Sequence, residues 1–85
     1  MVLPAPVLGC VWIPLTRGKF ALVDEADMTI VGGFNWHLNG KGVGGYAATL
    51  VNDKITLMHL LLVGKGYDHI SRDKLDNRRS NLRPA

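Results

Sequence analysis

The chain has 85 residues, enough for one small domain with a single modest hydrophobic core. Ten Lys and Arg against seven Asp and Glu give a formal net charge of +3, which points mildly to a polyanionic partner. The single cysteine, Cys10, excludes an internal disulfide and the paired CxxC knuckles that hold zinc in many small nucleic-acid-binding domains.

Residues 1–10 form the first distinct segment. They contain Pro4, Pro6 and Gly9 among small apolar residues, a composition that favours an extended arm over a helix. The apolar opening has no basic n-region and is interrupted by prolines, so it resembles neither a signal peptide nor a membrane span. We therefore expect a cytoplasmic protein without a membrane partner.

The segment that follows has the pattern of antiparallel strands joined by turns. Two β-favouring runs within residues 12–23 flank the polar turn 16–19, which predicts a hairpin. Asp24 is suited to capping a short helix, and the glycine pair 32–33 is suited to ending it.

A second hairpin is predicted further along the chain. Alternation in residues 34–39 and a β-favouring run at 46–51 flank a glycine-rich loop. That loop, 40–45, matches the dinucleotide pattern G-x-G-x-x-G, but no helix is predicted after it, so a flexible hairpin loop is the better interpretation. The apolar run 55–63 can be a strand or a helix, because periodicity does not divide it.

The C-terminal part, residues 64–85, carries the dense polar chemistry of the chain. Six basic and three acidic side chains give it an excess of three positive charges, so the rest of the chain is neutral. Within it, residues 67–83 read YDHISRDKLDNRRSNLR. An Asp-His pair can hold a divalent metal and supply a base, while the amides and arginines that follow can orient the base and bind phosphates.

The stretch Asp68-His69-Ile70, the loop 71–76 and the stretch Asn77-Arg78-Arg79-Ser80-Asn81-Leu82-Arg83 resemble the HNH, or His-Me finger, nucleases of the phage homing-endonuclease type. The resemblance implies a ββα-metal finger whose helix begins in the second stretch. It also implies that Asp68 is a metal ligand, that His69 is the general base and a member of the metal site, and that Asn81 orients the imidazole. The implied cofactor is Mg or Mn, with Zn as an alternative.

The resemblance extends more diffusely upstream, where residues 13–24 and 34–38 are similar to the sheet before the motif in phage HNH proteins. It implies a single α+β domain made of the arm 1–10, a small antiparallel DNA-binding-like sheet with a short helix at 11–63, and the finger at 64–85. The implied partner is double-stranded DNA, and a homodimer is possible. Phosphate contacts are expected from Arg72, Lys74, Arg78, Arg79 and Arg83.

Several residues keep two interpretations. His59 can contact the substrate or be a satisfied core histidine, and Asn77 can be a ligand or a turn former. The arginines can bind phosphate or form a solvated basic face. The family completes its metal site further along the helix, beyond Ala85, so a C-terminally short, inactive relative that binds DNA or a protein is the alternative function.

Overall fold

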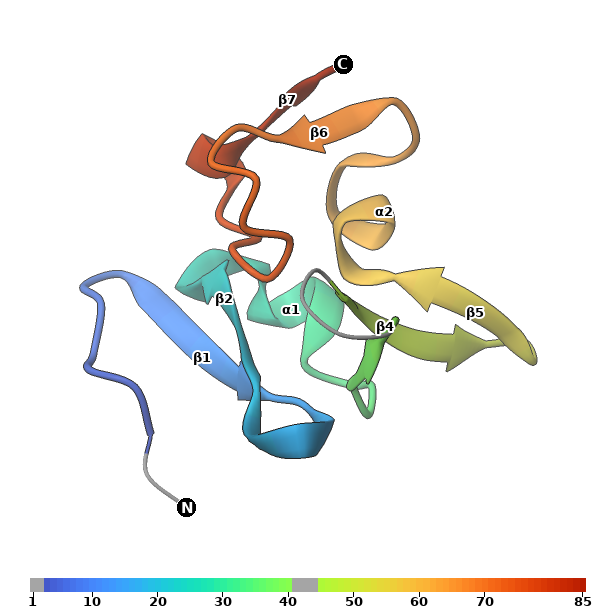
Figure 1. The fold of residues 1–85 in the computed structure, drawn as a ribbon, viewed down its shortest axis with the longest axis horizontal. Coiled ribbons are helices and arrows are strands. Elements are labelled where there is room, and N and C mark those ends of the chain that lie inside the picture. The colour runs from blue at the N-terminus through green and yellow to red at the C-terminus, as the bar shows by residue number, and fades with distance from the viewer. Residues whose placement is uncertain (1–2, 41–44) are drawn as a thin grey trace.

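The computed structural model describes residues 3–40 and 45–85 and shows an α+β fold, as expected (Figure 1). The described strands form three small antiparallel sheets, of two, three and two strands, where the sequence suggested one sheet before the finger. The domain measures 31 × 27 × 26 Å. In the described part of the chain, no helix has the length and apolar character needed to cross a membrane.

The first predicted hairpin is confirmed. Strands β1 (Cys10–Pro14) and β2 (Phe20–Asp24) pair antiparallel, with Ile13 opposite Ala21. The turn between them is a 3₁₀ turn in which Arg17 has φ 62°, in the left-handed region. The side chains of Ile13 and Ala21 are buried, so this hairpin supplies one wall of the core.

The short helix is also confirmed, as a 3₁₀ turn (Glu25–Asp27) that continues into α1 (Met28–Val31). Asp24 does not cap it. Its Oδ2 instead accepts a hydrogen bond of 3.0 Å from the backbone N–H of Arg79 in the C-terminal segment. Gly32 follows the helix, where a Cβ atom would lie 2.6 Å from the carbonyl oxygen of Met28.

A three-stranded sheet in the order β3-β4-β5 contains the second predicted hairpin. The strands are β3 (His37–Asn39), β4 (Tyr46–Val51) and β5 (Lys54–Leu57), while most of the glycine loop, residues 41–44, lies outside the described residues. Asn52 and Asp53 join β4 to β5 with φ angles of 50° and 63°, the left-handed geometry of a tight two-residue hairpin turn.

The ambiguous apolar run divides between a strand and a helix. Strand β5 ends at Leu57, and α2 (Met58–Val63) begins at the next residue and ends before Gly64, which has φ 84°. Met58 and Leu62, one helical turn apart, are both buried. They belong to a core cluster that draws on both hairpins and both helices: Ile13, Leu15, Ala21, Val23, Val31, Trp36, Ala47, Met58 and Leu62.

The C-terminal motif is a β-ribbon. Strand β6 (Tyr67–His69) pairs antiparallel with β7 (Leu82–Pro84), after a 3₁₀ turn at Arg79–Asn81. The expectation of a helix beginning at 77–83 is therefore wrong. Leu82 is buried opposite His69, and Arg83 precedes Pro84, a position where the helical conformation is sterically disfavoured.

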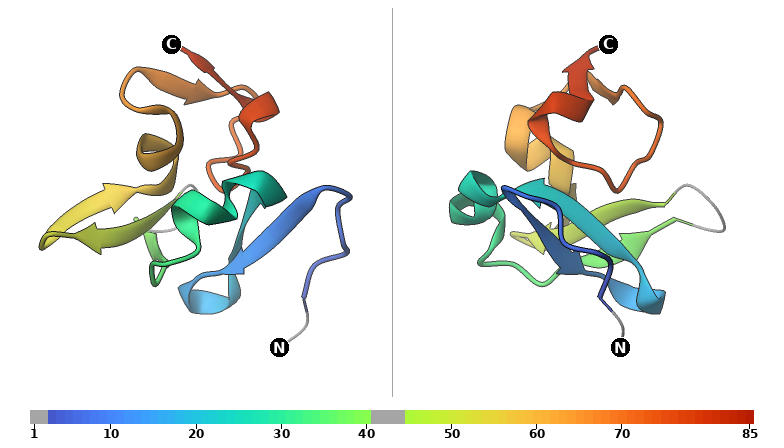
Figure 2. Two further views of the ribbon diagram at one scale, coloured as in Figure 1. Left: turned by 180° about the vertical axis from the view of Figure 1, so that it is seen from behind. Right: turned by 90° about the vertical axis from the view of Figure 1, so that its left-hand side faces the viewer.

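The long loop between β6 and β7 lies along β2, as Figures 1 and 2 show in agreement. The N–H of Leu22 donates to the carbonyl of Leu75 at 2.8 Å, and the N–H of Asn77 donates to the carbonyl of Leu22 at 2.7 Å. These two bonds attach the loop to the N-terminal hairpin and fix the backbone at Asn77.

Candidate functional site

Strand β6 directs Asp68 and His69 to opposite faces of the ribbon, because side chains alternate along a strand. Asp68 is exposed and His69 is only 4% exposed. The N–H of Ile70 donates to the carbonyl of Asn81, directly before β7, so the N–H of His69 points to the other edge of β6. There it donates to Oδ1 of Asp68 at 2.9 Å, which brings the carboxylate round to the edge of the strand.

The imidazole of His69 has a defined partner. Its Nε2 lies 2.7 Å from Oδ1 of Asn77, whose side chain is 1% exposed. A carbonyl oxygen only accepts hydrogen bonds, so this contact puts the proton on Nε2 and leaves a lone pair on Nδ1. His69 is therefore held in the tautomer in which Nδ1 can accept a proton.

Asn81 does not make the contact expected of it. Its Oδ1 accepts from the N–H of Ser71 at 3.0 Å, and its Nδ2 donates to the carbonyl of Asp76 at 2.9 Å. Asn81 therefore closes the loop, and the amide that orients the His69 ring is that of Asn77. Asn77 and Asn81 lie in the same polar run of the sequence. The path of the loop along β2 determines which of them bonds the imidazole of His69.

The ring of His69 also contacts a second histidine. The centroids of the His59 and His69 rings are 5.0 Å apart in an edge-to-face arrangement. Burial lowers the pKa of His59 below its usual 6.5 and the nearby His69 lowers it further, while Asp68 opposes both effects. His59 is 8% exposed, and its ring lies against that of the candidate base.

Tyr46 of β4 completes this cluster, and no sequence pattern indicates its role. Its ring stacks on His59 with centroids 5.5 Å apart and lies 6.1 Å from the ring of His69. The Lys74 ammonium lies 4.7 Å from the centre of the same ring, a cation–π contact. A tyrosine that opens a strand after a glycine loop has no chemical signature of its own, so the fold alone reveals it.

Two of the arginines expected to bind phosphate are paired with carboxylates of the same chain. Arg78 binds Asp76 through Nε at 2.8 Å and through Nη2 at 2.7 Å. Arg79 binds Asp27 through Nε at 3.0 Å. The hydrogen bond from Arg78 is the main reason that the pKa of Asp76 lies below its usual value, while burial opposes the shift.

Arg72 and Arg83 make no ion pair within residues 3–40 and 45–85. Arg72 is exposed in the tight turn after β6, with φ 66°. Arg83 is the cross-strand neighbour of Asp68 on the exposed face of the ribbon. Together with Lys74, these side chains place positive charge on both sides of β6.

The residues present suit some metals better than others. Three or more His, Cys, Asp or Glu side chains with the geometry of a metal site do not occur together in the described part of the chain. Structural and catalytic zinc sites usually have three or four protein ligands. Mg and Mn suit the residues present better, since Mg often takes one or two carboxylates and completes its shell with water and substrate phosphates. Asp68 offers such a carboxylate.

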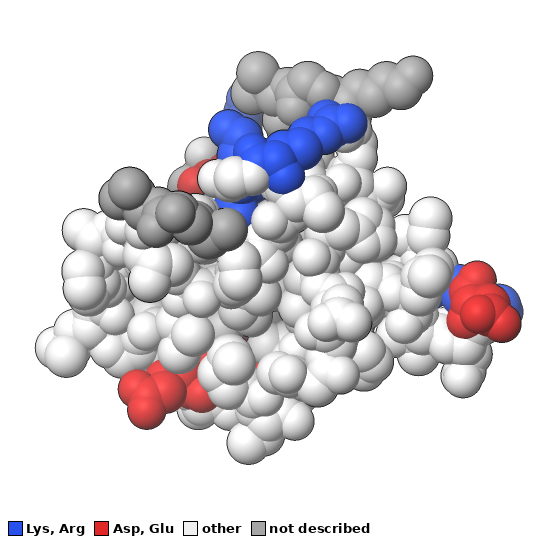
Figure 3. Space-filling model, turned by 90° about the horizontal axis from the view of Figure 1, so that it is seen from below, with Lys and Arg blue, Asp and Glu red and all other residues white. Residues whose placement is uncertain are grey.

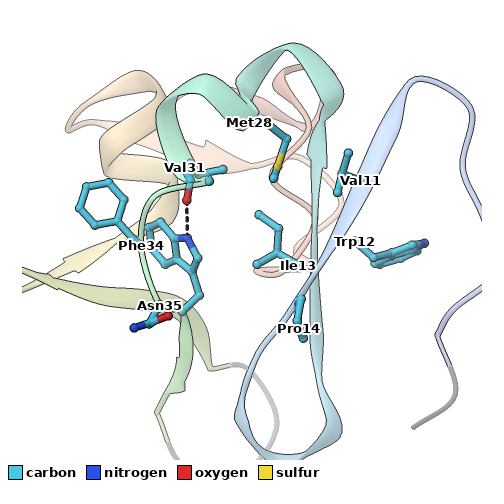
Figure 4. Close-up of a pocket in the computed structure, with 10 residues that line it drawn as sticks. Val11, Trp12, Ile13, Pro14, Met28, Val31, Phe34 and Asn35 are labelled. Carbon is cyan, nitrogen blue, oxygen red and sulfur yellow. Dashed lines mark hydrogen bonds between the residues drawn. The ribbon is translucent and has the colours of Figure 1, made fainter.

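A hollow of about 320 Å³ lies elsewhere, between β1 and the α1–β3 segment (Figure 4). Apolar side chains such as Ile13, Met28 and Phe34 line it, and Trp36 donates from Nε1 to the carbonyl of Val31 at 2.9 Å. None of the described residues that line this hollow has a titratable side chain, so they offer no acid, base or metal ligand.

The face opposite the C-terminal ribbon is largely uncharged (Figure 3). In that view the visible Lys and Arg side chains gather mainly in the upper part of the face, and the Asp and Glu side chains lie mainly at its lower left and right. Among the described residues, the cations around β6 are the candidates for contact with a polyanion that lie near His69.

Comparison with known proteins gives no match: no protein-family model, no curated protein and no solved structure is similar to this chain. The functional argument consequently rests on the residues of the β6–β7 ribbon and on their geometry.

Proposed function

We propose that this protein is a DNA-binding endonuclease of the HNH type, which hydrolyses phosphodiester bonds with a divalent metal and a histidine base. The observation that carries the proposal is the 2.7 Å contact between Nε2 of His69 and Oδ1 of Asn77. It fixes the tautomer of a buried imidazole, an arrangement suited to general base catalysis.

In the proposed reaction, Nδ1 of His69 takes a proton from a water molecule whose oxygen attacks the scissile phosphorus. The new P–O bond forms as the bond to the leaving oxygen breaks. Asn77 holds the imidazole and disperses part of the positive charge that develops on it. Asp68 would hold Mg or Mn, and such an ion, when bound, supplies polarisation of the phosphate and stabilisation of the leaving oxygen.

Double-stranded DNA is the proposed partner, and Arg72, Lys74 and Arg83 are the proposed phosphate contacts. They lie in the turn after β6, in the loop and on β7. Arg78 and Arg79 already neutralise carboxylates of the protein, so we assign them mainly to holding the loop. Phosphate contacts of this kind strengthen binding without reading the base sequence.

A second function follows if the metal site is too weak for catalysis. In that case Asp68 does not hold a metal firmly enough for hydrolysis, and the same fold acts as a DNA-binding relative without nuclease activity. The absence of a larger group of metal-ligating side chains from residues 3–40 and 45–85 favours this alternative. Metal-dependent cleavage separates the two functions.

The test is incubation of supercoiled plasmid with the protein and Mg or Mn, with a chelator control. Three proteins are compared: the natural chain, His69→Ala, and His37→Ala as a matched histidine substitution on β3. We expect metal-dependent nicking that is lost only in His69→Ala. Salt-sensitive DNA binding without nicking supports the inactive relative, whereas neither activity at low salt contradicts both functions.

A further inference from the structure

We infer that His59 is a second substrate-contacting residue, which donates a hydrogen bond from its imidazole to an oxygen of the phosphate that is attacked by the water activated by His69. The inference rests on the proposed function, because it assigns a role beside the proposed base. It begins from the position of the ring, whose centroid is 5.0 Å from that of His69.

The His59 ring is held firmly. Tyr46 stacks on it with an angle of 29° between the two planes, and Lys74 lies over the ring of Tyr46. His59 is the second residue of α2, directly after the fully buried Met58, so its backbone is anchored in the core. A group held in this way from three elements contacts a ligand with little loss of side-chain entropy.

The polar edge of His59 is not used inside the described protein. Within residues 3–40 and 45–85 its imidazole forms no side-chain hydrogen bond, in contrast to the Nε2 of His69, which bonds Asn77. Over the same residues, no fully buried side-chain nitrogen or oxygen lacks a partner. The nitrogens of His59 are therefore available to a ligand, although the ring itself is largely buried.

The chemistry of an imidazole fits this role. It carries at least one N–H donor in either protonation state, so the contact does not require His59 to be charged. A donor placed beside the attacked phosphorus stabilises the negative charge that builds up on the phosphate oxygens. Lys74 adds positive charge at the same wall of the site.

The test compares His59→Phe with His59→Gln. Phenylalanine keeps an aromatic ring between Tyr46 and His69 but has no N–H, while glutamine keeps a donor and loses the ring. We expect His59→Phe to lower the nicking rate by about 100-fold, as for removal of one preorganised donor, without weakening DNA binding. His59→Gln should recover part of that loss, and nicking by His59→Phe at the natural rate would overturn the inference while leaving the nuclease proposal intact.

A second measurement tests the contact of His59 with DNA if the natural chain does not nick the plasmid. The three histidines, His37, His59 and His69, give resolvable imidazole signals in ¹⁵N NMR, which is recorded on the full chain with and without a DNA dodecamer duplex. We expect the ring signals of His59 and His69 to shift and those of His37 to stay. Unchanged His59 signals under saturating DNA contradict the inference, whereas shifted signals without nicking support the contact and reject only the hydrolytic step.

Discussion

The guanidinium of Arg79 binds the carboxylate of Asp27, which lies 52 residues earlier in the chain. Asp27 is 5% exposed, while the side chain of Arg79 is about half exposed. The backbone N–H of Arg79 also donates to Asp24, so one residue joins the C-terminal ribbon to the start of the short helix. The Arg79–Asp27 ion pair therefore serves mainly to hold the domain together, and less to add surface charge.

Substitution of Arg79 should consequently destabilise the protein. Arg79→Ala leaves the buried Asp27 carboxylate without its partner, and we expect a loss of about 1–3 kcal/mol in the free energy of unfolding. Urea unfolding followed by circular dichroism measures it. Arg83→Ala, which removes an exposed arginine from β7, is the control and should change stability by less than about 0.5 kcal/mol. Equal effects of the two substitutions would contradict the structural role of Arg79.

The pair of Asp76 and Arg78 predicts a pH dependence. Arg78 holds the pKa of Asp76 below its usual 3.8, so the folded state binds this proton less readily than the unfolded state does. The stabilisation is complete above the unfolded pKa and is lost as the pH falls through the lower folded pKa. Asp76→Asn has no carboxylate to titrate at this position. Its free energy of unfolding should therefore fall less than that of the natural chain between about pH 4 and pH 2, the ordinary titration range of Asp.

Two arginines allow a clean test of phosphate binding. Arg72 and Arg17 are both exposed and both have left-handed backbone conformations, with φ 66° and 62°, which glycine adopts without strain. Arg72→Gly and Arg17→Gly therefore remove the same charge from similar turns without straining the backbone. Arg72 follows β6, whereas Arg17 lies in the β1–β2 turn at the other end of the domain (Figure 1).

We expect Arg72→Gly to weaken DNA binding and to reduce the slope of log K against log salt by about 0.9, as for the loss of one phosphate contact. Arg17→Gly should leave the slope unchanged. Fluorescence anisotropy with a labelled duplex at several salt concentrations measures both. The same slope in both variants and the natural chain would remove Arg72 from the DNA contacts.

Substitutions of Asn77 and Asn81 should differ in their effects on the nicking rate and on stability. Asn77→Ala removes the oxygen that fixes the His69 tautomer, and we expect nicking to fall by about 10-fold to 100-fold, as for loss of other groups that orient an active imidazole. Asn81→Ala opens the loop contacts to Ser71 and Asp76, so its main effect should be on stability. Nicking rates at temperatures where both variants remain folded distinguish them, and a larger rate loss in Asn81→Ala would reverse the assignment.

Local signals in the sequence predicted much of the fold. The hairpin turns at 16–19 and 52–54 and the short helix before Gly32 form because turn residues and β-favouring runs act over a few neighbours. The division of residues 55–63 could not be predicted, because burial of Met58 and Leu62 against distant residues decides it. The strand at Leu82 was likewise missed, since its pairing with His69 depends on the path of the whole loop.

The candidate site was predictable in its residue types and not in its contacts. Asp68 and His69 stood out as a polar pair, and in the structure the Asp68 carboxylate accepts a hydrogen bond from the backbone N–H of His69. The choice of Asn77 over Asn81, and the presence of Tyr46 beside both histidines, depend on elements that meet only in three dimensions. A count of charges likewise does not show that Arg78 and Arg79 form ion pairs with carboxylates of the same chain.

The backbone hydrogen bonds between Leu22 and the β6–β7 loop also affect the order in which parts of the fold can form. Asn77 reaches the imidazole only when its own backbone rests on β2, so contacts between residues far apart in the chain must form before the base has its partner. Contacts of such long sequence separation are slow to form, because the loop between them must first close. During synthesis the N-terminal hairpin is available before the β6–β7 loop, and it is the template on which that loop acquires its arrangement.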